Sequence, residues 1–115
     1  MHEASIVEAL LDRVEGEARA QGASAVHRVH VRLGELCGVE HDLLRSAYEM
    51  LRERGVCAGA ELEIAAIEAR WVCPGCEQVI GRGRALRCDD CGLPARLESG
   101  DEILLERIEM EVGVN

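Results

Sequence analysis

Four cysteines in two close pairs constrain this chain more than any other feature of its sequence. Cys73 and Cys76 form one C-x2-C pair, and Cys88 and Cys91 form a second pair after eleven intervening residues. Each pair can wrap two thiolates around one ion, and a hairpin between the pairs would bring all four sulfurs together. Four thiolates leave no open coordination position on a tetrahedral zinc, so the spacing predicts a structural zinc site.

The segment that carries these cysteines, residues 70–97, differs in composition from the rest of the chain. It holds both prolines and is rich in glycine and arginine, with few apolar residues to form a core. Zinc binding, on the order of 10–16 kcal/mol in small zinc domains, can fold such a segment. The alternative is a pair of redox dithiols, which normally lies at a strand-to-helix junction that the surrounding pattern lacks. We therefore expect residues 70–97 to form an inserted zinc ribbon.

The remaining sequence alternates between helical and strand periodicity. Apolar spacing predicts helices at 4–21 and 40–54, and alternation predicts strands at 25–33, 60–68 and 102–112. The strand–helix–strand portion suggests a right-handed crossover. We expect an α+β fold, in which a small three-stranded sheet with two helices on one face is built from residues 1–69 and 98–115 and carries the ribbon as an insert.

Apolar stripes predict which faces of these elements are buried. The stripe of the first helix consists of Ile6, Leu10 and Val14, flanked by Val7, Leu11 and Ala18. The stripe of the second helix consists of Leu43, Ala47, Met50 and Leu51. The residues in phase along the last strand are Leu104, Ile108, Met110 and Val112. Aromatic residues make up only 2% of the chain, so aliphatic side chains must fill the core.

The charge balance argues against two classes of partner. The net charge is -9, with 22 acidic residues against 13 arginines, whereas nucleic acids and anionic membranes require a positive surface. No apolar run approaches the roughly 20 residues of a membrane span, and no secretory signal is visible. Six cysteines without a secretory signal favour a reducing compartment, so we expect a cytoplasmic protein with metal-bound cysteines.

The sequence contains no recognisable catalytic pattern. No Ser-His-Asp or Cys-His arrangement and no glycine-rich phosphate loop is evident, so we expect no enzymatic activity. Cys37 and Cys57 stand apart from the paired cysteines, and the default role of such residues is that of a small buried hydrophobe.

The chain begins "MHEASIVEALL", which places His2 and Glu3 directly before a predicted helix. Taken alone, His2 is best interpreted as a solvated side chain at a frayed terminus. Glu3 alone is explained by the favourable interaction of a carboxylate with the N-terminal end of the helix dipole.

Four sequence features, taken together in their order along the chain, suggest a function for His2 and Glu3. The "MHE" start, "VRLGELCGVE" after the first strand, the two C-x2-C pairs and the closing "GDEILLERIEMEV" resemble the HypA/HybF family of NiFe-hydrogenase nickel-incorporation (maturation) proteins. The resemblance runs from Met1 to about Val112, which is nearly the whole chain. It implies a small α/β nickel domain with an inserted zinc ribbon, as the periodicity also indicates.

The resemblance implies a metallochaperone function. Ni(II) would be bound as cargo through His2 and Glu3, while Zn(II) would be held by the ribbon cysteines Cys73, Cys76, Cys88 and Cys91. The implied partners are a HypB-type GTPase and the NiFe-hydrogenase large subunit that receives the nickel. We expect the protein to be a monomer or a weak dimer.

The chemistry of Ni(II) explains why the terminus would serve as a site. Imidazole suits Ni(II), and a square-planar arrangement can combine the His2 ring with the backbone nitrogens of His2 and Glu3. A fourth ligand would be water, the Glu3 carboxylate, Glu40 or His41. The alternative for Glu40 and His41 is a polar helix start without a metal.

The histidines of the first predicted strand are expected to be structural. No histidine lies within the ribbon, and His27 and His30 are predicted on opposite faces of a strand, where both would be structural.

The first rival function is a zinc-ribbon adaptor that binds a protein or nucleic-acid partner without nickel. The second is a thiol-redox enzyme.

Overall fold

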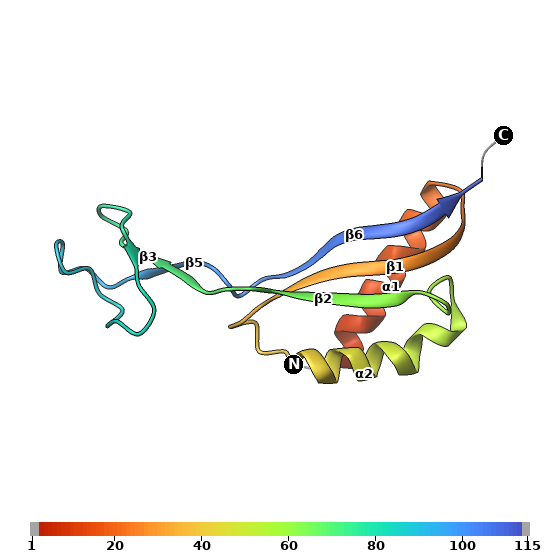
Figure 1. The fold of residues 1–115 in the computed structure, drawn as a ribbon, viewed down its shortest axis with the longest axis horizontal. Coiled ribbons are helices and arrows are strands. Elements are labelled where there is room, and N and C mark those ends of the chain that lie inside the picture. The colour runs from red at the N-terminus through yellow and green to blue at the C-terminus, as the bar shows by residue number, and fades with distance from the viewer. Residues whose placement is uncertain (1–2, 114–115) are drawn as a thin grey trace.

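The long strand β1 (Ala23–Gly34) forms the centre of a three-stranded sheet in a computed structural model that describes residues 3–113 (Figure 1). It pairs in parallel with β2 (Glu61–Ile67) and antiparallel with β6 (Ile103–Val112). A parallel pair requires a crossover, which α2 (His41–Leu51) and the 3-10 helix η1 (Arg52–Arg54) provide. The expected α+β architecture is confirmed.

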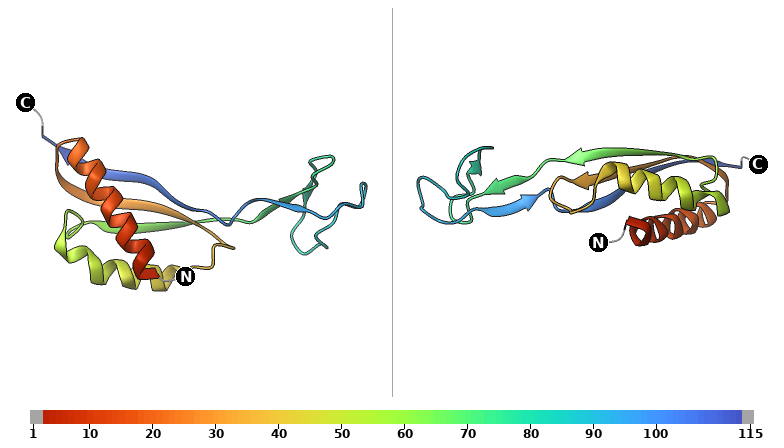
Figure 2. Two further views of the ribbon diagram at one scale, coloured as in Figure 1. Left: turned by 180° about the vertical axis from the view of Figure 1, so that it is seen from behind. Right: turned by 90° about the horizontal axis from the view of Figure 1, so that it is seen from below.

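Both helices cover the same face of this sheet, as the right-hand view of Figure 2 shows. The first helix, α1 (Glu3–Ala20), packs against α2 and against β1. One core forms between the helices and the sheet, and its members are largely aliphatic. The buried core residues are Val7, Val14, Ala18, Val26, Val29, Val31, Leu33, Val39, Leu44, Tyr48, Cys57, Ala60 and Leu62.

The buried face of α2 differs from the prediction. Leu44 and Tyr48 are fully buried, whereas Leu43 and Met50, which were expected in the core, are 49% and 78% exposed. Tyr48 can be buried because its hydroxyl donates a hydrogen bond to the carbonyl oxygen of Ala60 at 2.9 Å. Ala47 and Leu51, also predicted for this stripe, do pack against the core, so the prediction was right for two of its four residues and missed Leu44 and Tyr48.

A bulge corrects the predicted phase of β6. The register of β1 against β6 shifts between His30 and Val31, so that one extra residue lies on β6. One inserted residue turns all following side chains to the other face of a strand. As a result Leu105 packs against the core together with Ile108, while Leu104 is 45% exposed.

A second register shift, between Val26 and Arg28, affects the histidines of β1. His27 lies 3.5 Å from Glu111, and His30 contacts Glu109. The two glutamates alternate along β6 and so share a face. The prediction that the two histidines lie on opposite faces was wrong, because the bulge brings both to the side of the sheet away from the helices.

A second small sheet lies at the far end of the molecule, which measures 59 × 32 × 17 Å along its principal axes (Figure 1). Its strands are β3 (Arg70–Val72), β4 (Val79–Ile80) and β5 (Arg96–Ser99), in the order β4-β3-β5. β3 follows β2 almost directly and β5 leads into β6, so two chain segments connect the sheets. No helix among the described residues is both long and apolar enough to cross a lipid bilayer.

The two sheets meet at a tight crossing of Gly34, Ala69 and Gly100, which we call the waist. A side chain at Gly34 would lie 2.1 Å from the carbonyl oxygen of Gly100. A side chain at Gly100 would lie 2.5 Å from the Cα of Ala69, and Gly100 has a φ of 113°. Only glycine has room and backbone freedom for these positions. The connection between the sheets is therefore a packed crossing.

Candidate metal centre

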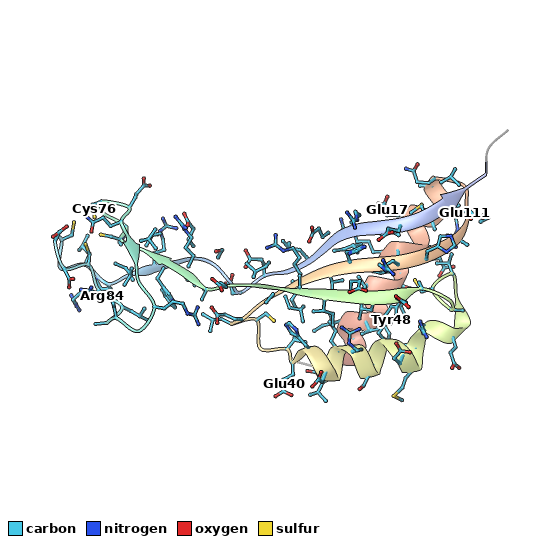
Figure 3. All side chains as sticks on the ribbon, in the orientation of Figure 1. Glu17, Glu40, Tyr48, Cys76, Arg84 and Glu111 are labelled. Carbon is cyan, nitrogen blue, oxygen red and sulfur yellow. The ribbon has the colours of Figure 1, made fainter. Side chains whose placement is uncertain are left out.

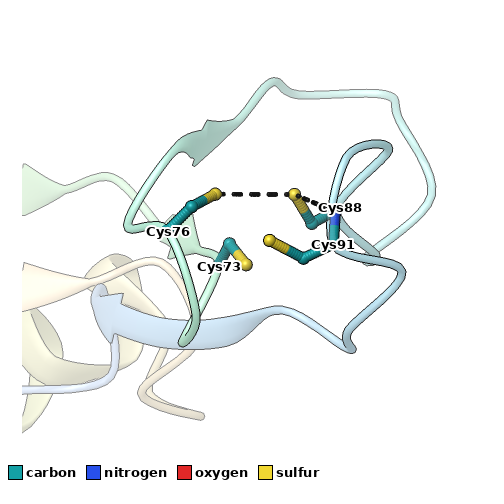
Figure 4. A group of neighbouring side chains, drawn as sticks. All are labelled: Cys73, Cys76, Cys88 and Cys91. Atoms are coloured by element: carbon teal, nitrogen blue, oxygen red, sulfur yellow. Dashed lines mark hydrogen bonds between the residues drawn. The ribbon is translucent and has the colours of Figure 1, made fainter.

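The sulfur atoms of Cys73, Cys76, Cys88 and Cys91 lie together at the end of the second sheet (Figure 4). All four are within 4.8 Å of one another, and the sulfurs of Cys76 and Cys88 are 3.7 Å apart. Cys73 and Cys88 are buried, whereas Cys76 and Cys91 are exposed. The structure thus brings together the four residues that the spacing singled out.

These distances fit a zinc ion. With Zn–S bonds of ~2.3 Å, the sulfurs of a tetrahedral site lie ~3.8 Å apart, which the Cys76–Cys88 separation matches. The donor set is also suited to zinc, because four soft thiolates with tetrahedral geometry are typical of structural zinc sites. The four residues present therefore fit the metal that the sequence predicts.

The pKa values of two of these cysteines are shifted by their neighbours. The backbone N–H groups of Cys76 and Gly75 point at the sulfur of Cys73 and lower its pKa to about 7. The neighbouring sulfurs of Cys76 and Cys73 raise the pKa of Cys91 to about 12. Four thiolates at this spacing repel one another, so a bound positive charge favours the ionisation of all four.

Each cysteine pair lies on a tight turn. The N–H of Gly75 donates to the sulfur of Cys73 at 3.3 Å, and the N–H of Cys91 donates to the sulfur of Cys88 at 3.4 Å. The left-handed position falls directly after the second cysteine of each pair, at Glu77 (φ 63°) and Gly92 (φ 68°). Glu77 was not foreseen, since a glutamate gives no sequence signal for this conformation.

Gly75 has a different role in the first turn. A side chain there would lie 2.9 Å from Leu93 and 3.6 Å from the sulfur of Cys91. Gly75 is thus required for the close approach of the two turns. Of the two glycines in these turns, only Gly92 has a left-handed backbone.

The remaining two cysteines lie away from this cluster. Cys57 is buried in the core of the first sheet, where loss of solvent raises its pKa. Cys37 is half-buried, with its sulfur 3.8 Å from the carbonyl oxygen of Val39. Within residues 3–113, the four-cysteine cluster is the one group of three or more cysteine, histidine or acidic side chains that could hold a metal.

The predicted nickel ligands are only partly covered by the described residues. His2 lies outside them, and Glu3 is the first residue of α1. Glu40 precedes α2 and makes no side-chain capping hydrogen bond, and His41 is the first residue of that helix. Both Glu40 and His41 are exposed. Figure 3 shows Glu40 at the end of α2 that is nearer the ribbon.

The first turns of α1 and α2 lie side by side, as Figures 1 and 2 show from three directions. The fold therefore places Glu3 at the same end of the helical layer as Glu40 and His41. The positive ends of both helix dipoles also meet here, and acidic side chains in both first turns (Glu3 and Asp42) oppose that charge.

Comparison with known proteins extends the resemblance seen in the sequence. A family model described as "Hydrogenase/urease nickel incorporation, metallochaperone, hypA" matches residues 1–110. The hydrogenase maturation factor HypA of Wolinella succinogenes is 40% identical over 114 residues, covering 96% of this chain and 96% of that protein. The corresponding factor of Shewanella baltica is 36% identical over 114 residues, covering 96% of this chain and 97% of its own length.

The fold agrees as well. The solution structure of the Ni metallochaperone HypA from Helicobacter pylori matches with a TM-score of 0.75 and 30% sequence identity, covering 98% of this chain and 100% of that one. The chain therefore belongs to the HypA family of hydrogenase maturation factors, which are nickel metallochaperones.

Proposed function

We propose that this protein binds Ni(II) at its N-terminus and helps to deliver it to the NiFe-hydrogenase large subunit during maturation. The observation that carries this proposal is the match to a nickel-incorporation family model that begins at residue 1 and so includes the "MHE" start. Nickel is the cargo, with His2 and Glu3 as its ligands.

The proposed site uses the position of these residues at the start of a helix. The first N–H groups of an α-helix have no partner within the helix, so the backbone nitrogen of Glu3 is free to ligate. Two adjacent backbone nitrogens and the His2 imidazole give three nitrogen ligands in a plane, an arrangement that suits Ni(II). These nitrogens must lose protons on binding, so nickel affinity should rise with pH.

The fourth ligand is proposed to come from the neighbouring helix start or from the Glu3 carboxylate. Glu40 is exposed and uncommitted to a capping bond, and His41 follows it. Both belong to the turn that lies beside the first turn of α1 (Figure 1). A carboxylate at this end also offsets the two helix dipoles, whose positive ends would otherwise disfavour a cation.

The ribbon is proposed to hold a structural zinc through Cys73, Cys76, Cys88 and Cys91. Four protein ligands leave no coordination position for a substrate, so no catalytic reaction is assigned to the metal or to the chain. We propose two modules, an α/β nickel domain of residues 1–69 and 98–115 and a zinc ribbon of residues 70–97.

The proposed partners follow from the task of a nickel chaperone. They are a HypB-type GTPase and the hydrogenase large subunit, which the protein would meet in the cytoplasm as a monomer or weak dimer. The net charge of -9 disfavours nucleic acid as a partner.

Nickel titration of the zinc-loaded protein with its native terminus tests this proposal. We expect one nickel per chain, a yellow absorption band typical of planar Ni(II), and no release of zinc. A zinc-ribbon adaptor without a nickel function would bind no nickel under these conditions, or would bind it only by displacing zinc from the cysteines. Either outcome would contradict the nickel site at the terminus.

A further inference from the structure

Glu35, the first residue after β1, connects the two modules through its side chain. Its carboxylate accepts hydrogen bonds from Arg82 at 2.7 Å and 3.2 Å, one to each oxygen. One of these oxygens also accepts the backbone N–H of Ala69 at the waist, at 2.5 Å. Arg82 lies 47 residues further along the chain, in the loop between the two cysteine pairs.

The geometry of this contact makes it directional. Two parallel N–H donors of one guanidinium on two oxygens of one carboxylate fix both distance and angle, which a single ion pair does not. The guanidinium of Arg82 and the N–H of Ala69 hold the pKa of Glu35 at about 2. Glu35 therefore stays ionised, and keeps this contact, throughout the neutral pH range.

Beyond the backbone crossing at the waist, the side chains between the two modules are not closely packed. A cavity of about 260 Å³ lies beside the ion pair, between the two modules. Its lining includes Leu36 from the first module and Trp71, Ile80 and Leu86 from the second. A tightly filled apolar interface would fix the orientation of the ribbon by itself, but here the apolar side chains line a pocket that opens to the surface. The ion pair spans the edge of that space.

The segment that begins at Glu35 leads from the waist to the start of α2, which is the end of that helix nearer the ribbon (Figure 3). The N–H of Glu35 donates to the carbonyl oxygen of Ile67 at 2.9 Å, and the N–H of Leu36 donates to that of Gly100 at 2.7 Å. Five residues beyond Glu35 is Glu40, where α2 begins. One short loop thus joins the waist to the helix start that carries the candidate nickel ligands.

We propose that Glu35 is a positioning residue, which with Arg82 forms a latch that holds the zinc ribbon in one orientation against the α/β domain and holds the loop between β1 and α2 in place. The orientation follows from the contacts alone. The consequence for nickel rests on the proposed function, because it requires the cargo to lie at the helix starts.

An exposed ion pair contributes little to the free energy of unfolding, so the latch can be broken in a folded protein. Glu35→Gln keeps the size of the side chain and an acceptor for Ala69, but removes the charge that binds Arg82. Arg82→Gln removes the partner. Glu61→Gln and Arg84→Gln are matched controls, since Glu61 pairs with Arg28 within the sheet and Arg84 pairs with Asp89 within the ribbon.

The test measures residual dipolar couplings of the zinc-loaded full chain by NMR, together with the fluorescence anisotropy of Trp71, the single tryptophan. We expect both modules of the parent protein and of the two controls to share one alignment. Glu35→Gln and Arg82→Gln should each lose the shared alignment and lower the anisotropy of Trp71. The double variant should be no looser than either single variant, because both remove the same contact.

A shared alignment that survives in both Glu35→Gln and Arg82→Gln would overturn the latch. Nickel release is then timed in the parent and in Glu35→Gln, and faster release in the variant supports the link to the loop. Equal release would overturn that link. If the parent binds no nickel, the proposed function fails, whereas the alignment data still decide the latch.

Discussion

The two modules of this protein are stabilised in different ways. The α/β domain has a distributed core of thirteen buried residues, which come from both helices, from β1 and β2 and from the loops between them, and β6 packs partly buried side chains against it. In residues 70–97 only Val72, Cys73 and Cys88 are buried, and two of these three are proposed metal ligands. A distributed core loses stability in small steps when single residues change, whereas a ribbon that depends on one ion should lose its structure at once.

The largest expected effect comes from removing a ligand. Cys88→Ser should release about one zinc per chain and unfold residues 70–97, because zinc binding on the order of 10–16 kcal/mol is also the folding energy of such a segment. The helices and the first sheet should persist. Metal analysis and NMR spectra of the two modules measure these effects.

Cys37→Ser is the matched control, since its half-buried sulfur lies outside the cluster. It should leave zinc content and spectra unchanged. Simultaneous loss of the helical signal in Cys88→Ser would show that the α/β domain also depends on the metal.

A core substitution should lower the stability of the α/β domain and leave the zinc ribbon unchanged. Leu44→Ala removes a side chain that is 1% exposed, and such changes cost about 2–5 kcal/mol of unfolding free energy. Met50→Ala on the same helix removes a side chain that is 78% exposed and should change stability by less than ~0.5 kcal/mol. Denaturant unfolding followed by circular dichroism gives both values. Zinc loss that shifts to lower denaturant concentration together with the helical signal in Leu44→Ala would mean that the modules do not unfold separately.

A substitution in the waist should lower the stability of the protein by a smaller amount. Gly100→Ala places a side chain against Ala69 and imposes strain at a φ of 113°, which costs about 1–3 kcal/mol for the backbone alone. Gly59→Ala is the control, because nothing lies within 4 Å of a side chain at that position. Thermal unfolding with zinc bound compares the two. Equal melting temperatures would contradict the tight crossing.

The smallest expected effect concerns pH. The pKa of Glu35 in the folded protein is about 2, below its ordinary value of 4.5. A lowered pKa in the folded state means that the contribution of the carboxylate is present above the unfolded value and is lost as pH falls through about 2. The anisotropy of Trp71 should therefore stay constant from about pH 8 to about pH 5 while zinc remains bound.

Zinc content is measured at each pH, since protons compete for the cysteines. Loosening of Trp71 with a midpoint near pH 4.5, with zinc still bound, would show that Glu35 titrates like a free carboxylate.

Much of the fold could be predicted from local patterns. Periodicity placed each long element of the α/β domain, and the spacing of the cysteines identified the cluster because metal ligands must be paired closely along the chain. The ends of the elements were predicted less accurately. For example, α2 ends at Leu51, and the last turn that was predicted for it is the separate helix η1. The burial of Tyr48 on α2 was missed because its hydrogen bond to Ala60 is a tertiary contact.

Other features depend on contacts that have no local pattern. The bulge that turns Leu105 inward arises from pairing between distant strands. The waist requires glycines at 34 and 100, which look like ordinary turn residues in the sequence. Glu35 gave no signal either, because its partner Arg82 is 47 residues away.

The proposed cargo site lies at the first residues, apart from the zinc ribbon. Calorimetric nickel titration of native-terminus protein against His2→Ala tests it most directly, with zinc content and melting temperature measured in both. His27→Ala is the control, since that exposed histidine contacts only Glu111 among the ion pairs of the described residues. We expect a large loss of nickel affinity in His2→Ala alone, with zinc and melting temperature unchanged. Equal nickel affinity in all three proteins would contradict the account.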